Sequence, residues 1–170
     1  MGVVLVEGVT DRIALESVAS RLALDLDGIE IVPIGGAQAI RRAAAQQEGK
    51  RVVGLCDVGE ERWFRRVLGD STYACDKDLE DELIRALGAD RVQAVIAAQG
   101  ELDTFRSFQN QLFWRGRPVE MQLRRWLQNG GRQHRYPPLL VEAMEPGEIP
   151  RPLAGVLTEV LGQTAVADSL

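Results

Sequence analysis

The sequence is poor in several residue types, and these shortages narrow its possible functions. Its 170 residues include 2 cysteines, 1 histidine and 5% aromatic residues. The two cysteines, Cys56 and Cys75, fit the role of small buried apolar residues better than that of a disulfide. Because His134 is the one histidine and no Cys-x-x-Cys pair occurs, a zinc site is not expected.

Long hydrophobic runs are also missing. No stretch of about 18 apolar residues occurs, so no membrane span is expected. Residues 1–8 lack the basic region of a signal peptide, and their apolar part is too short for one. We therefore expect a cytoplasmic protein. Hydrophobic residues make up 45% of the chain, which is enough for the core of one domain, with or without an appendage.

Charge is unevenly distributed in this chain of net charge −5. Residues 1–100 hold 17 acidic and 12 basic residues, whereas residues 101–135 hold 3 acidic and 7 basic ones. All seven bases of this arginine-rich segment are arginine, whose planar group suits bidentate contacts with phosphate. The alternative explanation is a solvated helix surface.

Apolar runs of strand length alternate with helical patterns over residues 1–88. Strands are expected at 2–6, 29–34, 51–56 and 71–75, and helices at about 11–24, 37–47, 60–68 and 79–88. Thr10 or Asp11 is expected to cap the first helix. The alternation is typical of an α/β fold, with a mainly parallel sheet of about four strands flanked by helices.

After residue 90 only helical patterns occur, at about 90–98, 101–113, 118–128, 136–144 and 150–161. Tyr136 and the two prolines after it are expected to break the chain before the last helices. We therefore expect three parts: an α/β core over 1–90, a helical C-terminal extension over 91–162 and a flexible tail over 163–170.

Carboxylates follow the expected strands. Glu7 ends the first and Asp57 the third, and a third acidic group follows the fourth: Asp76, Asp78, Glu80, Asp81 and Glu82. The carboxyl ends of parallel strands meet at one edge of a sheet, so these groups should converge. A single acid such as Glu7 has a structural explanation, but three crowded sites repel one another unless a cation neutralises them. Oxygen ligands of this kind suit Mg²⁺ or Mn²⁺.

The ordered set of motifs resembles the TOPRIM domain of topoisomerases and primases. It is more closely similar to the TOPRIM domain of the OLD (overcoming lysogenization defect) family of endonucleases. The matching stretches are Val-Glu-Gly-Val-Thr-Asp-Arg-Ile-Ala-Leu-Glu, Val-Pro-Ile-Gly-Gly-Ala, Gly-Leu-Cys-Asp-Val-Gly-Glu-Glu-Arg-Trp-Phe-Arg-Arg and Asp-Leu-Glu-Asp-Glu-Leu-Ile. They cover roughly residues 2–90, and a weaker match continues through 115–118. The resemblance implies a Rossmann-like fold with metal-dependent phosphodiester chemistry.

The resemblance also implies roles for particular acids. Glu7 would be a metal ligand or general acid/base, and Asp11 would face the same site from one helical turn further on. Asp57 would be the first aspartate of the family's Asp-x-Asp pair. Asp78 and Glu80 would match its later ligand pair.

Two positions depart from the family pattern. Gly59 stands at the second position of Asp-x-Asp, so we add the adjacent and longer Glu60 to the candidate metal ligands. Arg117 stands where OLD-type enzymes usually carry a lysine that stabilises charge in the transition state. An arginine can stabilise an anion but cannot donate a proton near neutral pH.

OLD-family proteins usually join TOPRIM to an ATPase, but no Gly-x-x-x-x-Gly-Lys-Ser/Thr motif occurs here. We therefore expect a standalone domain, or part of a system whose ATPase is a separate protein. The expected function is that of a Mg²⁺- or Mn²⁺-dependent endonuclease-type hydrolase acting on nucleic acid, DNA in preference to RNA. Glu7 and Arg117 would be catalytic, and phosphates would be contacted by Arg115, Arg117, Arg124 and Arg125.

Two alternatives use the same residues differently. The first is a catalytically weak TOPRIM module that binds nucleic acid or a partner protein. The second is a phosphatase-like enzyme acting on small phosphates, which would leave the arginine-rich segment without a purpose.

Overall fold

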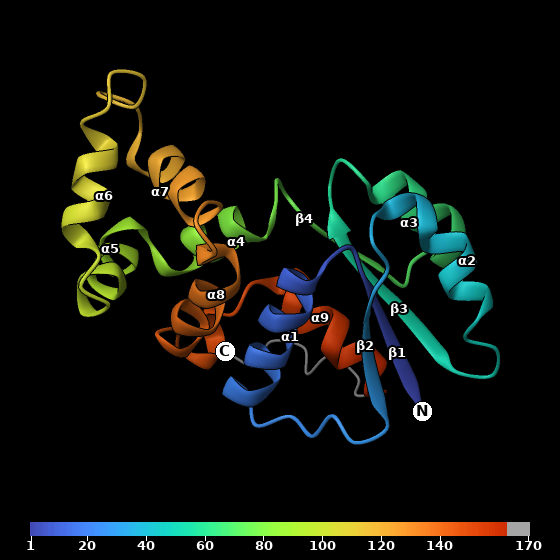
Figure 1. The fold of residues 1–170 in the computed structure, drawn as a ribbon. Coiled ribbons are helices and arrows are strands. Elements are labelled where there is room, and N and C mark those ends of the chain that lie inside the picture. The colour runs from blue at the N-terminus through green and yellow to red at the C-terminus, as the bar shows by residue number, and fades with distance from the viewer. Residues whose placement is uncertain (163–170) are drawn as a thin grey trace.

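The computed structural model describes residues 1–162, and a parallel sheet lies at its centre (Figure 1). Its strands are β1 (Gly2–Val6), β2 (Ile29–Pro33), β3 (Arg51–Asp57) and β4 (Thr72–Cys75). They lie in the order β2-β1-β3-β4, and each neighbouring pair is parallel. All five residues of β1 are buried, as expected for a central strand that is apolar on both faces. The α/β fold class expected from the sequence is confirmed.

Helices cover both faces of the sheet. The turn η1 (Ala37–Ala39), helix α2 (Ile40–Ala45) and helix α3 (Glu61–Leu68) pack on the face formed by Val3 and Leu5. Helices α1 (Val9–Arg21) and α9 (Arg151–Val160) pack on the opposite face, formed by Val4 and Val6. Gly54 allows α3 to approach β3 closely, because a Cβ there would lie 2.6 Å from side-chain atoms of Phe64.

The other helices extend from one side of the sheet (Figure 1). They are α4 (Leu79–Leu87), α5 (Ala89–Ala98), α6 (Leu102–Gln109), α7 (Val119–Leu127) and α8 (Arg132–Glu142), followed by the turn η2 (Pro146–Glu148). No helix within residues 1–162 combines the length and the hydropathy that crossing a membrane requires.

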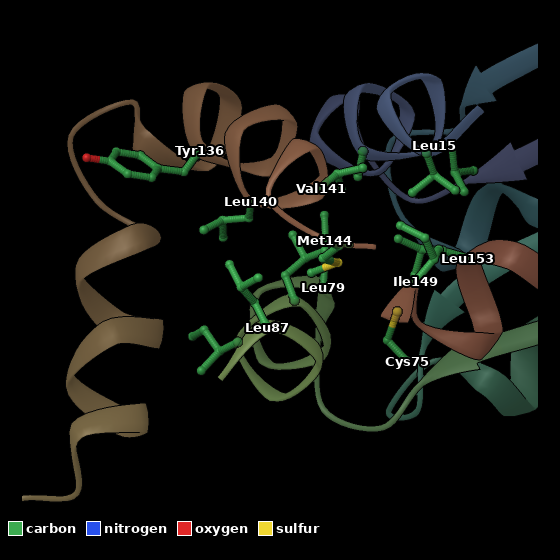
Figure 2. Close-up of a cluster of buried hydrophobic side chains, with 14 of the residues drawn as sticks. Leu15, Cys75, Leu79, Leu87, Tyr136, Leu140, Val141, Met144, Ile149 and Leu153 are labelled. Atoms are coloured by element: carbon green, nitrogen blue, oxygen red, sulfur yellow. The ribbon is translucent and has the colours of Figure 1, made fainter. Parts of the chain in front are cut away.

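A single hydrophobic cluster links the sheet to these helices. Figure 2 shows Leu15 of α1, Leu79 of α4 and Leu153 of α9 in the same core as Leu140 and Met144. The core therefore continues across residue 90. A boundary between two parts at that residue stays a prediction, and the tail expected at 163–170 lies outside the described residues.

The start of α1 differs from the expected one. The helix begins at Val9 with Gly8 as its N-cap, so capping by Thr10 or Asp11 was wrong. Asp11 instead occupies the third helical position, from which its carboxylate accepts a hydrogen bond of 2.9 Å from the Gly8 N–H. A carboxylate at this position can satisfy the free N–H of the cap residue, and this fixes the Asp11 side chain.

Helix α8 also differs from expectation. It begins at Arg132 and contains Pro137 and Pro138, so the expected break at these prolines was wrong. Each proline removes one intrahelical hydrogen bond, but its fixed φ is compatible with a helix. Tyr136 and Leu140 are buried at this point, and the burial offsets the missing bonds.

Candidate metal centre

Glu7 connects three segments at the carboxyl edge of the sheet, the edge where its parallel strands end. Its Oε1 accepts a hydrogen bond of 2.9 Å from the backbone N–H of Asp57 at the end of β3. Its backbone carbonyl accepts bonds from the N–H groups of Gly35 and Gly36, at 3.1 and 3.3 Å, after β2. Both glycines have positive φ, of 76° and 115°, which residues with a side chain rarely adopt. The strand ends therefore hold Glu7 in place.

Asp11 and Asp57 lie close enough to Glu7 to disfavour each other's charge. Burial, followed by the charge of Glu7, raises the pKa of Asp57 from 3.8 to about 7. Burial likewise raises the pKa of Asp11 from 3.8 to about 6, although the Gly8 N–H opposes the shift. The pKa of Glu7 is also raised, first by burial. The carboxylates that the sequence assigned to one edge thus interact in the folded protein.

Asp78 and Glu80 reach this site from the first turn of α4. Asp78 is the N-cap of α4, and its Oδ1 accepts a hydrogen bond of 2.9 Å from the Asp81 N–H. Glu80 is buried, and its burial raises its pKa. The charges of both Asp78 and Glu80 contribute to the raised pKa of Asp57. We call Glu7, Asp11, Asp57, Asp78 and Glu80 the carboxylate cluster.

Helix α7 contacts the cluster at Asp78. Arg124 Nε and Gln128 Nε2 donate to Asp78 Oδ2 at 2.7 and 3.0 Å, and Arg124 Nη2 lies 2.5 Å from the same oxygen. Gln128 also approaches Glu80 Oε2 at 3.5 Å. Arg124, which the sequence assigned to nucleic-acid binding, therefore neutralises the carboxylate of Asp78.

Two comparisons bear on this arrangement. Residues 1–57 match the family model "Overcoming lysogenization defect protein-like, TOPRIM domain". The resemblance to an OLD-like TOPRIM domain is confirmed. The match spans Glu7, Asp11 and Asp57, whereas Asp78, Glu80 and the helical region lie beyond it. No curated protein gives a significant sequence match.

Solved structures extend the likeness to almost the whole chain. The C-terminal region of the Burkholderia pseudomallei OLD protein superposes with a TM-score of 0.67 at 15% identity, covering 95% of this chain and 96% of that one. The C-terminal region of the Xanthomonas campestris pv. campestris OLD protein, phased with platinum, gives 0.67 at 21% identity, covering 94% and 91%. At these identities the likeness establishes the fold.

Glu60, the added candidate ligand, follows Gly59 in the turn after β3. Its charge contributes to the raised pKa of Glu7, after burial. Glu7 and Glu60 also line the same surface hollow of about 460 Å³, together with Gly35, Gly36 and Gln38. The side chain of Glu60 is thus near enough to Glu7 to affect it.

The donor set fits a hard divalent cation. All five cluster members offer carboxylate oxygens, and within residues 1–162 no basic group forms an ion pair with Glu7, Asp11, Asp57 or Glu80. A cation would offset the burial and the mutual repulsion that raise their pKa values. As the side chains stand, however, no three His, Cys, Asp or Glu residues in the described part of the chain surround a common metal position. Binding would require rotation of these side chains.

The remaining acids of the third group point to other partners. Asp81 forms ion pairs with Lys77 and Arg85, at 3.1 and 2.7 Å. Glu82 Oε1 accepts from the Asp76 N–H at 2.8 Å and also pairs with Arg85. These contacts hold the turn between β4 and α4, so Asp81 and Glu82 have a structural role.

Arg115 and Arg117 lie in the connection between α6 and α7, which Figure 1 shows at the end of the helical region away from the sheet. Arg115 donates to the carbonyl of Asn110, and Arg117 donates to that of Phe113 and stacks on its ring at 4.1 Å. Arg125 is exposed on α7. The structure thus brings Arg124 to the cluster, while the other three arginines face solvent outside it.

Sequence reasoning missed Gln128. Its amide lies between Asp78 and Glu80, but a single glutamine in a helix carries no recognisable signal in one sequence. The spacing of about one turn from Arg124 places both side chains on the same face of α7, and this was the available clue.

Proposed function

We propose that the chain is a Mg²⁺- or Mn²⁺-dependent nuclease module that hydrolyses phosphodiester bonds in nucleic acid, DNA in preference to RNA. One observation carries the proposal: Glu7, Asp11, Asp57 and Glu80 are partly or fully buried and raise one another's pKa values, and within residues 1–162 none of them forms an ion pair, although the charge of Arg124 acts on Glu80. Such an arrangement is unfavourable unless a cation is present, and it lies at the edge where parallel α/β sheets bind ligands.

The chain's own residues would divide the work as follows. Glu7, Asp11, Asp57 and Glu80 would hold the cation, with Glu60 and Asp78 at its margin. The bound ion would lower the pKa of a water nucleophile and stabilise the leaving oxygen. Because the Asp57 N–H fixes Oε1 of Glu7, the other carboxylate oxygen is oriented and could also accept a proton from the attacking water.

The arginines would supply the positive surface that an acidic protein needs to approach a phosphate backbone. Arg115 and Arg117 would contact phosphates from the connection between α6 and α7, and Arg125 would do so from α7. Stabilisation by Arg117 of charge on the cleaved phosphate would require this connection to move toward the carboxylate cluster. Arg124 would have two roles, because it already holds Asp78. A separate ATPase or other protein is the expected partner. We place the protein in the cytoplasm, which the two free, buried cysteines support.

Calorimetry and a nuclease assay test this function together. The parent should bind Mg²⁺ or Mn²⁺ and cut DNA in its presence, whereas Glu7→Gln should lower cleavage by a factor of 100 or more, as a rough estimate for a lost ligand or base. Asp70→Asn is the matched control, since this carboxylate is fully exposed and pairs only weakly with Arg65. Equal cleavage by both variants would contradict the assignment.

A catalytically weak module that binds nucleic acid or a partner protein is the second candidate. It is favoured by Gly59, which supplies no ligand, and by the ion pair that occupies Asp78. In that case the parent would bind nucleic acid with unchanged affinity in metal or chelator, and no cleavage would accompany binding.

A further inference from the structure

Helices α2 and α3 carry four arginines that have no acidic partner within the part of the chain that the structure describes. Arg41 and Arg42 lie on α2, Arg62 and Arg66 lie on α3, and all four are exposed. Within residues 1–162 none of them forms an ion pair or a side-chain hydrogen bond. Within the described residues, two other arginines also form neither an ion pair nor a side-chain hydrogen bond: Arg125 and Arg151. Charge counting along the sequence hides this surface, because residues 1–100 are acidic overall.

The other arginine of α3 shows the contrast. Arg65 donates to Glu61 at 2.6 Å and also lies 3.9 Å from Asp70. The acids of α3 and of the turn after it therefore pair with Arg65, and no ion pair involves Arg62 or Arg66 within residues 1–162. Since α2 contains no acidic residue and α3 contains only Glu61, the two helices carry five arginines and one acid in a protein of net charge −5.

Arg62 and Arg66 both contact the ring of Trp63. The guanidinium carbons of Arg62 and Arg66 lie 4.9 and 5.8 Å from the centre of its indole ring. Such contacts limit the freedom of long side chains without using their hydrogen-bond donors. Both guanidinium groups thus remain able to bind phosphate oxygens at a reduced entropic cost.

The position of this surface relates it to the carboxylate cluster. Arg41 and Arg62 are each the second residue of their helix, close to the loops that leave the carboxyl edge of the sheet, whereas Arg42 and Arg66 lie in the last turns. Those loops line the hollow that also contains Glu7 and Glu60. Figure 1 shows α2 and α3 on one side of this edge and α7 on the other.

We propose that Arg41, Arg42, Arg62 and Arg66 form a second phosphate-binding surface, which we call the α2–α3 surface, and that a nucleic-acid duplex spans the carboxyl edge from α7 to it. This inference rests on the proposed function and specifies its substrate as a duplex long enough to contact both sides. The cluster itself repels phosphates, so positive groups on both sides hold the backbone across it. The contacts are to the backbone and carry no sequence preference.

Fluorescence anisotropy with a labelled duplex of about 20 base pairs tests the α2–α3 surface directly. The variant R62Q/R66Q should bind roughly tenfold more weakly, and the slope of log affinity against log salt should become shallower by about 1.8. The variant R41Q/R42Q should behave alike. The charge-matched control is K50Q/R51Q, which removes the same charge at the opposite end of β3 and should stay within about twofold of the parent. Because Lys50 pairs with Glu30 and Arg51 donates to the Glu159 carbonyl, a thermal melt of this control checks that it remains folded.

Length and strand type complete the test. The parent should bind a duplex of about 20 base pairs much more tightly than one of about 6, and R62Q/R66Q should lose most of that gain. DNA and RNA duplexes, and a single strand of equal length, are compared in the same assay. Equal binding of the short and long duplexes, tighter binding of the single strand, or equal affinities of R62Q/R66Q and K50Q/R51Q would overturn the inference.

Calorimetry with Mg²⁺ and Mn²⁺ separates this inference from the proposed function. A parent that binds a duplex through these arginines but neither binds metal nor cleaves would overturn the nuclease assignment alone. A parent that cleaves, with R62Q/R66Q cleaving and binding like its control, would overturn the α2–α3 surface alone. The four side chains are exposed, so thermal melts of the variants should match the parent.

Discussion

The ionised carboxylate of Asp57 is unfavourable in the folded protein, and it lies in the candidate metal centre. Asp57 ends β3, where its backbone N–H holds Glu7 while its own carboxylate faces other acids. In the metal-free protein, burial and these neighbours disfavour its ionised form. Unfavourable electrostatic energy of this kind is expected at functional positions, where a bound ligand can lower it.

Replacing this charge should stabilise the metal-free protein. Asp57→Asn keeps the side-chain shape and removes the repulsion, so we expect a gain of about 1 kcal/mol at pH 8, or a rise in Tm of about 2–4 °C. The same variant should lose the further stabilisation that Mg²⁺ gives the parent. Calorimetric melts with and without Mg²⁺ measure both effects, with Asp70→Asn as the exposed control. A lower Tm for Asp57→Asn in chelator would contradict the prediction.

The same carboxyls predict how stability changes with pH. The pKa of Asp57 rises from 3.8 to about 7 and that of Asp11 to about 6, so the folded state retains protons that the unfolded state releases. Their contribution is therefore fully present below about pH 4 and is lost as the pH rises toward 7. Melts in chelator should show Tm declining across this window relative to Asp57→Asn. Mg²⁺ should reduce the decline, and a parent curve parallel to that of the variant would rule out this cause.

At the residue scale, the sequence predicted where the carboxylates lie in the sheet better than it predicted which side chains contact one another. Glu7 and Asp57 could be placed at one edge because each follows an apolar strand, and strand ends meet there. The pairing of Arg124 with Asp78 joins residues 46 positions apart through the packing of α7 on α4, and no local pattern encodes it. The unpaired arginines of α2 and α3 were missed because a count of charges does not reveal which charges have partners.

At the scale of elements, α7 is the part that joins the helical region to the site. Leu123, Trp126 and Leu127 are buried, and Arg124 and Gln128, each next to a buried leucine, reach the cluster from beside this apolar surface. The apolar spacing predicted this helix well. It could not predict which surface of α4 the helix would meet, because that depends on tertiary packing.

A substitution in α7 tests whether Arg124 serves structure or binding. Arg124→Ala leaves the buried carboxylate of Asp78 with only Gln128 and its own backbone partner, so we expect a loss of about 1–3 kcal/mol. Arg125→Ala is the matched control, because this neighbouring arginine is exposed and should change stability by less than about 0.5 kcal/mol. Urea unfolding measures both.

Binding to a DNA duplex completes that comparison. If Arg124→Ala loses stability yet binds as the parent does, Arg124 is purely structural and its assignment to nucleic-acid binding is wrong. If both variants bind more weakly, α7 contributes to the phosphate surface as proposed.

At the scale of the whole molecule, helix α9 connects the two ends of the chain. It packs against β1, β3 and β4, although residues 76–150 lie between it and β4 in the sequence. The alternation of strands and helices identified the sheet. It did not indicate that α9 would cover part of the face formed by Val4 and Val6. Periodicity describes which side of an element is apolar, not which partner covers it.

The contribution of α9 predicts the fate of a shortened chain. Leu153, Val156, Leu157 and Val160 are almost completely buried, and each such side chain contributes about 1.5–3 kcal/mol, a sum comparable to the stability of a whole domain. A fragment of residues 1–90 would expose the α9-facing side of the sheet and should not fold, giving poorly dispersed amide signals and no cooperative melt. Mixing it with residues 91–170 should restore the parent spectrum if the two pieces associate through this core. A cooperative melt of the fragment alone would instead show that residues 1–90 form an independent domain, and that the continuous core seen in Figure 2 is not required for folding.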